Sequence, residues 1–105
     1  MEEQLAASIM EARKAVEHTA DLFYQQKNPD GYTELNLTIT KLMAVVDELM
    51  HRQTIDNESL IIVDQTLNSA LAKAMEAIER KDTILLADIL AFDIDKKLKE
   101  SLECI

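Results

Sequence analysis

The chain has 105 residues, 48% of them hydrophobic and 30% charged, a composition typical of one globular domain. Its net charge of −9 speaks against nucleic acid and anionic membranes as partners, because both bind basic surfaces. Two tyrosines and two phenylalanines are the only aromatic residues, so the core must be built from aliphatic side chains.

The ends of the chain and its single cysteine indicate a compartment. Cys104 has no second cysteine to pair with, so no intramolecular disulfide can form. The sequence contains no run of about 18 apolar residues, and it begins with acidic residues where a signal peptide would be basic. We therefore expect a cytoplasmic protein.

The first predicted helix covers residues 2–26. Its apolar positions recur at steps of four and three, which keeps them on one face of a helix: Leu5, Ile9, Ala12, Val16, Thr19 and Phe23. The only proline and the only glycine follow, in residues 27–31. Proline disfavours helical geometry in the residue before it, and glycine permits a left-handed turn, so this stretch is expected to end the helix.

The second predicted helix covers residues 32–53. Leu35, Leu42 and Leu49 lie on its apolar stripe together with Ile39 and Val46. Residues 35–40 also alternate between apolar and polar side chains, which is typical of a strand. A single strand would have no partner in this chain, so the pattern favours a helix.

Two further helices are predicted over residues 57–80 and 83–103. Asp56 and Asp82 precede them and can cap their free backbone amides. The last helix has a stripe in steps of four residues: Leu86, Leu90, Ile94, Leu98 and Leu102. Short links make successive helices antiparallel neighbours. Residues 1–105 are therefore expected to form a single all-α domain, an up-down-up-down antiparallel four-helix bundle.

Candidate chemistry is sparse. Glu48 and His51 form a Glu-x-x-His pair of the kind that di-iron bundles use, but those sites need a second such pair. The other histidine, His18, follows Ala15 at that spacing, so the second pair is missing. There is no glycine-rich loop or nucleophile motif. We read Asp88 and Asp95 as solvent-exposed, with Lys99 a possible partner of Asp95. No enzymatic activity and no cofactor is expected.

The second helix carries more apolar residues than one buried face needs. Four of them lie outside the main stripe: Leu37, Met43, Val45 and Met50. One interpretation is that this helix is the most buried of the bundle. The other is that these residues bind a partner, either a second copy or another protein, with methionine providing an adaptable surface.

One stretch near the end resembles known proteins. Residues 74–82, followed by Leu85-Leu86-Ala87-Asp88-Ile89-Leu90, are similar to the closing helical pair of small, functionally uncharacterised bacterial proteins. As a class, short acidic bundles also resemble flagellar and type III export chaperones, which cover a helical segment of a client. This resemblance implies a chaperone-like role at the level of fold analogy.

We therefore expect a non-catalytic interaction protein, an adaptor or chaperone-like bundle that binds a helical segment of a partner through an apolar face. The residues assigned to that face are Leu37, Met43, Val45 and Met50. A homodimer, a protein partner, or both are expected. The alternative is a bundle that binds a metal or a small ligand through Glu48 and His51.

Overall fold

The computed structural model describes the backbone of residues 2–52 and 58–104 and the side chains of residues 4–49 and 65–103. Its elements are α1 (Glu2–Tyr24), α2 (Asn28–Arg52), α3 (Glu58–Glu79), α4 (Thr83–Asp88), the π-helical segment η1 (Ile89–Ile94) and α5 (Asp95–Cys104). The last three follow each other without a break and are together called the C-terminal helix. The described residues contain no strand, so the all-α prediction is confirmed, and residues 35–40 are helical.

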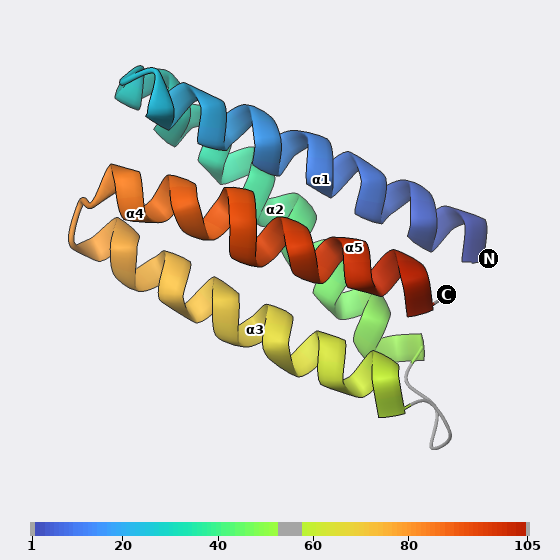
Figure 1. The fold of residues 1–105 in the computed structure, drawn as a ribbon. Helices are drawn as coiled ribbons and strands as arrows, with labels where there is room; N and C mark the ends of the chain where they lie inside the picture. Colours follow the sequence, from blue (N-terminus) through green and yellow to red (C-terminus); the bar gives the residue numbers. More distant parts are fainter. Residues whose placement is uncertain (1, 53–57, 105) are drawn as a thin grey trace.

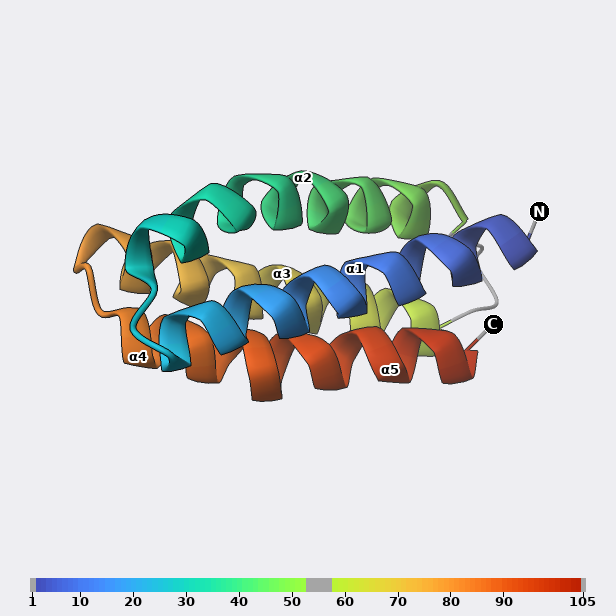
Figure 2. The same cartoon turned by 90° about the horizontal axis from the view of Figure 1, so that it is seen from above.

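The four helical rods pack side by side in an elongated molecule of 43 × 23 × 18 Å. Each rod contacts two others: α1 packs against α2 and the C-terminal helix, and α3 packs against the same two. Figure 1 shows α2 crossing behind the other rods, and Figure 2 shows it on the side opposite the C-terminal helix. The arrangement is compatible with a four-helix bundle. None of the described helices combines the length and apolar character needed to cross a bilayer.

A left-handed residue ends α1, but it is not the glycine. Gln26 has a φ of 62°. The amide of Lys27 donates to the carbonyl of Leu22, and the amide of Gln26 donates to that of Phe23, which is the Schellman arrangement of a helix end. The helix therefore ends before the proline, two residues short of the prediction.

The start of α2 corrects the prediction at Pro29 and Gly31. The helix begins at Asn28 rather than Tyr32 and includes both residues. Proline suits the first turn because its missing amide would have no partner there. Gly31 does not have a positive φ; instead it is buried against Phe23, where a Cβ would lie 2.8 Å from the ring. Glycine is required at this position because a larger residue would clash with the ring of Phe23.

The turn between α3 and α4 also has a left-handed residue, as the end of α1 does. Lys81 has a φ of 56°, and the amide of Asp82 donates to the carbonyl of Ala77. The carboxylate of Asp82 then accepts a hydrogen bond of 3.1 Å from the amide of Leu85. The predicted cap at Asp82 is confirmed. Asp56 lies outside the described residues.

The core is aliphatic and continuous along the bundle. All six residues of the predicted α1 stripe are buried. In the described part of α3, Leu67, Ala70, Ala74 and Ala77 are buried, whereas the larger Leu71 and Ile78 are only partly buried. Alanines facing the core let the neighbouring helix approach closely, and the larger side chains then cover the flank of the contact.

Candidate functional site

A groove runs between α1 and the C-terminal helix. Its volume is about 540 Å³, within the range of ligand-binding clefts. We call it the α1–η1 groove. Its floor is apolar and consists of small side chains, Val16 and Ala20 from α1 and Ala91 from η1. The remaining residues that line it are Met10, Arg13, Lys14, Glu17, Asp21 and Asp95.

One end of the α1–η1 groove is bridged by an ion pair. The Nε atom of Arg13 lies 2.9 Å from Oδ1 of Asp95, and its Nη2 atom lies 3.4 Å from Oδ2. Both side chains are about one-third exposed. The hydrogen bond to Asp95 raises the pKa of Arg13 above its ordinary value, and the charges of Asp95 and Glu17 add to the rise. Asp95 thus pairs with Arg13 on another helix, and not with Lys99 as the sequence predicted.

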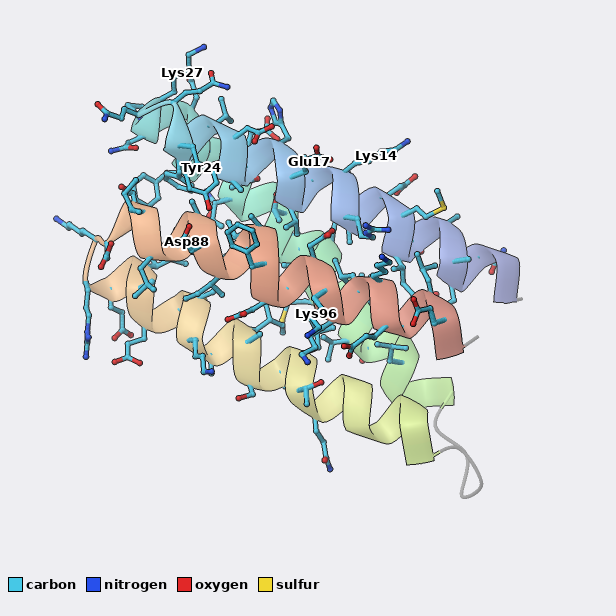
Figure 3. All side chains as sticks on the ribbon, in the orientation of Figure 1. Lys14, Glu17, Tyr24, Lys27, Asp88 and Lys96 are labelled. Atoms are coloured by element: carbon cyan, nitrogen blue, oxygen red, sulfur yellow. The ribbon has the colours of Figure 1, made fainter. Side chains whose placement is uncertain are left out.

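The second bridge is a hydrogen bond between Tyr24 and Asp88. The hydroxyl of Tyr24 donates to Oδ1 of Asp88 at 2.5 Å, and Figure 3 shows the two residues beside each other where α1 faces α4. Desolvation raises the pKa of Tyr24 to about 12, and the hydrogen bond and the charges of Asp88 and Asp21 contribute. This interaction joins two residues that are 64 positions apart in the sequence.

The two bridges fix the relative direction of α1 and the C-terminal helix. Arg13 precedes Tyr24 in α1, but its partner Asp95 follows Asp88 in the C-terminal helix. The two helices are therefore antiparallel. The distance along α1 between the bridges is three turns, roughly 16 Å at the usual rise per residue.

The π-helical segment η1 forms one wall of the groove. The amide of Asp95 donates to the carbonyl of Leu90, five residues earlier, as in a π-helix. The buried positions Leu86, Leu90, Ile94 and Leu98 recur in strict steps of four. Such a stripe would drift around an α-helix of 3.6 residues per turn, and the wider π turn brings it back to the core.

Phe92 is the most exposed large apolar side chain of the described residues, at 66%. It follows Ala91 on the groove floor and lies one helical turn after Asp88, which forms the Tyr24 bridge. Met10, at the other end of the α1–η1 groove, is 53% exposed. The sequence analysis did not select either residue.

The partner-binding residues predicted on α2 do not form one surface. Val45 is fully buried, so its assignment to an exposed face is wrong: the helix turns Thr38 and Val45 toward the core. Leu37 and Met43 are 52% and 57% exposed. Six residues apart, they lie about 120° apart around the helix. The side chain of Met50 lies outside the described residues.

The alternative site at Glu48 and His51 is described only in part. Glu48 is half-buried, and the side chain of His51 lies outside the described residues. Among the residues that the structure does describe, no three histidine, cysteine or acidic side chains come together as metal ligands would.

A second, smaller groove of about 220 Å³ lies on the α3 side of η1. Leu85, Ile89 and Asp93 form its C-terminal-helix wall. Arg80 and Glu76 line the α3 side and pair with each other at 2.7 Å, in the open solvent. Exposed ion pairs of this kind contribute little to stability. The volume of this second groove is less than half that of the α1–η1 groove.

Comparison with known proteins gives a family without an assigned role. A search of curated proteins finds no match, and neither does a search of solved structures. A family model does match, and it covers residues 2–103, which includes all four helical rods. The chain therefore belongs to the family described as Domain of unknown function (DUF8042).

Proposed function

We propose that this protein is a non-catalytic interaction module, an adaptor or chaperone-like bundle, that binds a helical segment of a partner protein in the α1–η1 groove. The observation that carries the proposal is the shape of the groove: an apolar floor of Val16, Ala20 and Ala91, open to solvent over three helical turns. A floor of small side chains can receive the larger side chains from one face of an amphipathic helix.

Two exposed apolar residues support this choice of surface. Met10 lines the α1–η1 groove and can adapt its unbranched side chain to different contacts. Phe92 directly follows Ala91 in the sequence and is 66% exposed, and aromatic residues are enriched at protein interfaces. Burying both side chains against a partner would remove apolar surface from water.

The proposal keeps three expectations from the sequence and changes one. The rods are taken to alternate in direction as an up-down-up-down bundle, the protein is taken to act in the cytoplasm, and a homodimer that leaves the α1–η1 groove free stays a prediction. The binding surface moves from α2 to the α1–η1 groove, because Val45 belongs to the core. No observation in the described residues supports a metal or small-ligand function at Glu48 and His51.

Co-purification from the native cells tests the surface. The tagged protein is compared with the double variant Met10→Ser/Phe92→Ser and with the control Leu37→Ser/Met43→Ser, which removes apolar side chains of similar exposure on α2. We expect one specific partner with the wild type and the control, and its loss with the groove variant. Loss with the control alone would return the site to α2. Light scattering on the same samples reports whether the partner is a second copy.

A further inference from the structure

We propose that the segment bound in the α1–η1 groove is cationic, an amphipathic helix whose lysine or arginine side chains lie against Glu17 and Asp21. This inference rests on the proposed function and adds the chemistry of the partner. Glu17 and Asp21 are exposed, line the groove, and are four residues apart on α1, so they share one face of that helix. Ala20 lies between them in the sequence and forms part of the floor.

The charges of the α1–η1 groove are unevenly distributed. Asp95 already engages the guanidinium of Arg13, so that pair adds no net charge. Lys14 offsets one of the two carboxylates of Glu17 and Asp21, which leaves the residues that line the groove with a net charge of −1. Figure 3 shows Lys14 and Glu17 in succession along α1 toward Tyr24 and Asp88. The groove lining of α1 is therefore acidic over its last turn, at Glu17 and Asp21.

The shape and charge together select a basic amphipathic partner. A lysine or arginine can lay its methylene stem over Ala20 and Ala91 and still hold its charged group beside Glu17 or Asp21 in solvent. Apolar side chains of the same helix face would contact Phe92 and Met10. Opposite charges across an interface increase association rates and exclude wrong partners more than they increase affinity.

The same charges disfavour a second copy as the occupant. The chain carries a net charge of −9, and two copies repel each other as they approach. An anionic lipid surface is disfavoured for the same reason. A basic helix from another protein is the occupant that the charges favour.

Two model peptides test the inference by calorimetry. One is an amphipathic Leu/Lys helix of about 12 residues, long enough to span the groove, and the other is a Leu/Glu helix with the same apolar pattern. They are titrated into the wild type and into two double variants that each lose two negative charges. Glu17→Gln/Asp21→Asn changes the groove, and Glu11→Gln/Glu79→Gln changes exposed acidic residues that do not line it.

We expect the Leu/Lys helix to bind the wild type and to weaken roughly three- to tenfold with Glu17→Gln/Asp21→Asn, but less than about twofold with the control. Amide chemical shifts of Ala20 and Ala91 should move on binding. Equal binding of the Leu/Glu helix at those two alanines would overturn the charge preference and leave the proposed function standing. No binding of the Leu/Lys helix, or equal weakening by both variants, would also overturn the inference. The co-purification experiment tests the proposed function independently of these outcomes.

Discussion

Thr19 and Thr38 share a buried hydrogen bond between α1 and α2. Their hydroxyl oxygens lie 2.7 Å apart, and both residues are fully buried. Both hydroxyls also lie within donor distance of the carbonyl oxygen of Ala15, Thr19 at 2.8 Å and Thr38 at 3.3 Å, so the two threonines and this carbonyl form one hydrogen-bonded cluster. These are two of only three polar residues buried in the described part of the chain.

This pair predicts a non-additive response to substitution. Thr38→Val should lower the free energy of unfolding by about 1–3 kcal/mol, because the variant loses a buried hydrogen bond and places a methyl group against a polar oxygen. The double variant Thr19→Val/Thr38→Val should lose less than the sum of the two single variants, since both polar groups are then replaced. Urea denaturation of the four proteins measures the coupling. Additive losses would show that the hydroxyls do not act together.

Gly31→Ala should destabilise the protein although alanine is the better helix former. The added Cβ would lie 2.8 Å from Cε1 and 2.9 Å from Cδ1 of Phe23, whose ring is fully buried. Overpacking of this kind costs about 1–3 kcal/mol, and the helix propensity returns at most about 1 kcal/mol. We expect a net loss of about 1 kcal/mol in chemical denaturation. Phe23→Leu should reduce the cost of the alanine, and an unchanged cost would mean that the ring is not the obstacle.

The hydroxyl of Tyr24 should lose its proton at a higher pH than an ordinary tyrosine hydroxyl. Its pKa is raised from 10.0 to about 12, which means that folding favours the neutral phenol. The stability from this group is therefore fully present below pH 10 and is lost as the pH rises toward 12. The absorbance of the phenolate, compared between the wild type and Tyr24→Phe, isolates its titration. Asp88→Asn should lower this pKa, and an unchanged value would assign the rise to desolvation and the charge of Asp21.

Leu42 and Leu37 separate the buried face of α2 from its exposed face. Leu42 is fully buried and Leu37 is 52% exposed. Leu42→Ala should lower the free energy of unfolding by about 2–5 kcal/mol, whereas Leu37→Ala should change it by less than about 0.5 kcal/mol. Thermal and urea denaturation of both variants make the comparison. Similar losses for the two would place Leu37 in an interface.

Removing one residue from η1 should be tolerated. Deleting the exposed Phe92 shortens the step between Leu90 and Ile94 from four residues to three, which an ordinary α-helix accommodates on one face. Deleting Lys14 from α1 instead rotates Val16 and every later stripe residue away from the core. We expect a folded helical protein in the first case, judged by circular dichroism and cooperative melting, and loss of cooperative folding in the second.

Regular spacing explains which parts of the fold were predictable. The six residues selected by steps of four and three in α1, from Leu5 to Phe23, are all buried, although the pattern omitted Ala20, which is buried as well. The steps of four from Leu86 to Leu98 also resembled an ordinary helical stripe. Because every step is four residues, with none of three, the pattern itself indicated a π turn. In α3, Ala70 and Ala77 are buried while the larger Leu71 and Ile78 are only partly buried, and hydrophobicity alone does not show how closely two helices approach.

The candidate site depended on information that periodicity does not contain. Arg13 and Asp95 are 82 positions apart, and nothing in the spacing of either helix shows that they meet. The rotation of each helix about its axis decides whether Val45 is core or surface, and a wide apolar stripe leaves that rotation open. The helix ends show a related limit: Gln26 and Lys81 take the left-handed conformation that sequence rules reserve for glycine.

The pairing of α1 with the C-terminal helix means that the α1–η1 groove joins the two ends of the chain. Neither the α1–α2 hairpin nor the pair formed by α3 and the C-terminal helix contains it alone, since each supplies one wall. A molecule that binds there contacts both walls only when the two helix pairs have packed together, and so it raises the stability of the whole fold by mass action. Occupancy of the groove would thus distinguish completely folded molecules from chains that have formed only one half.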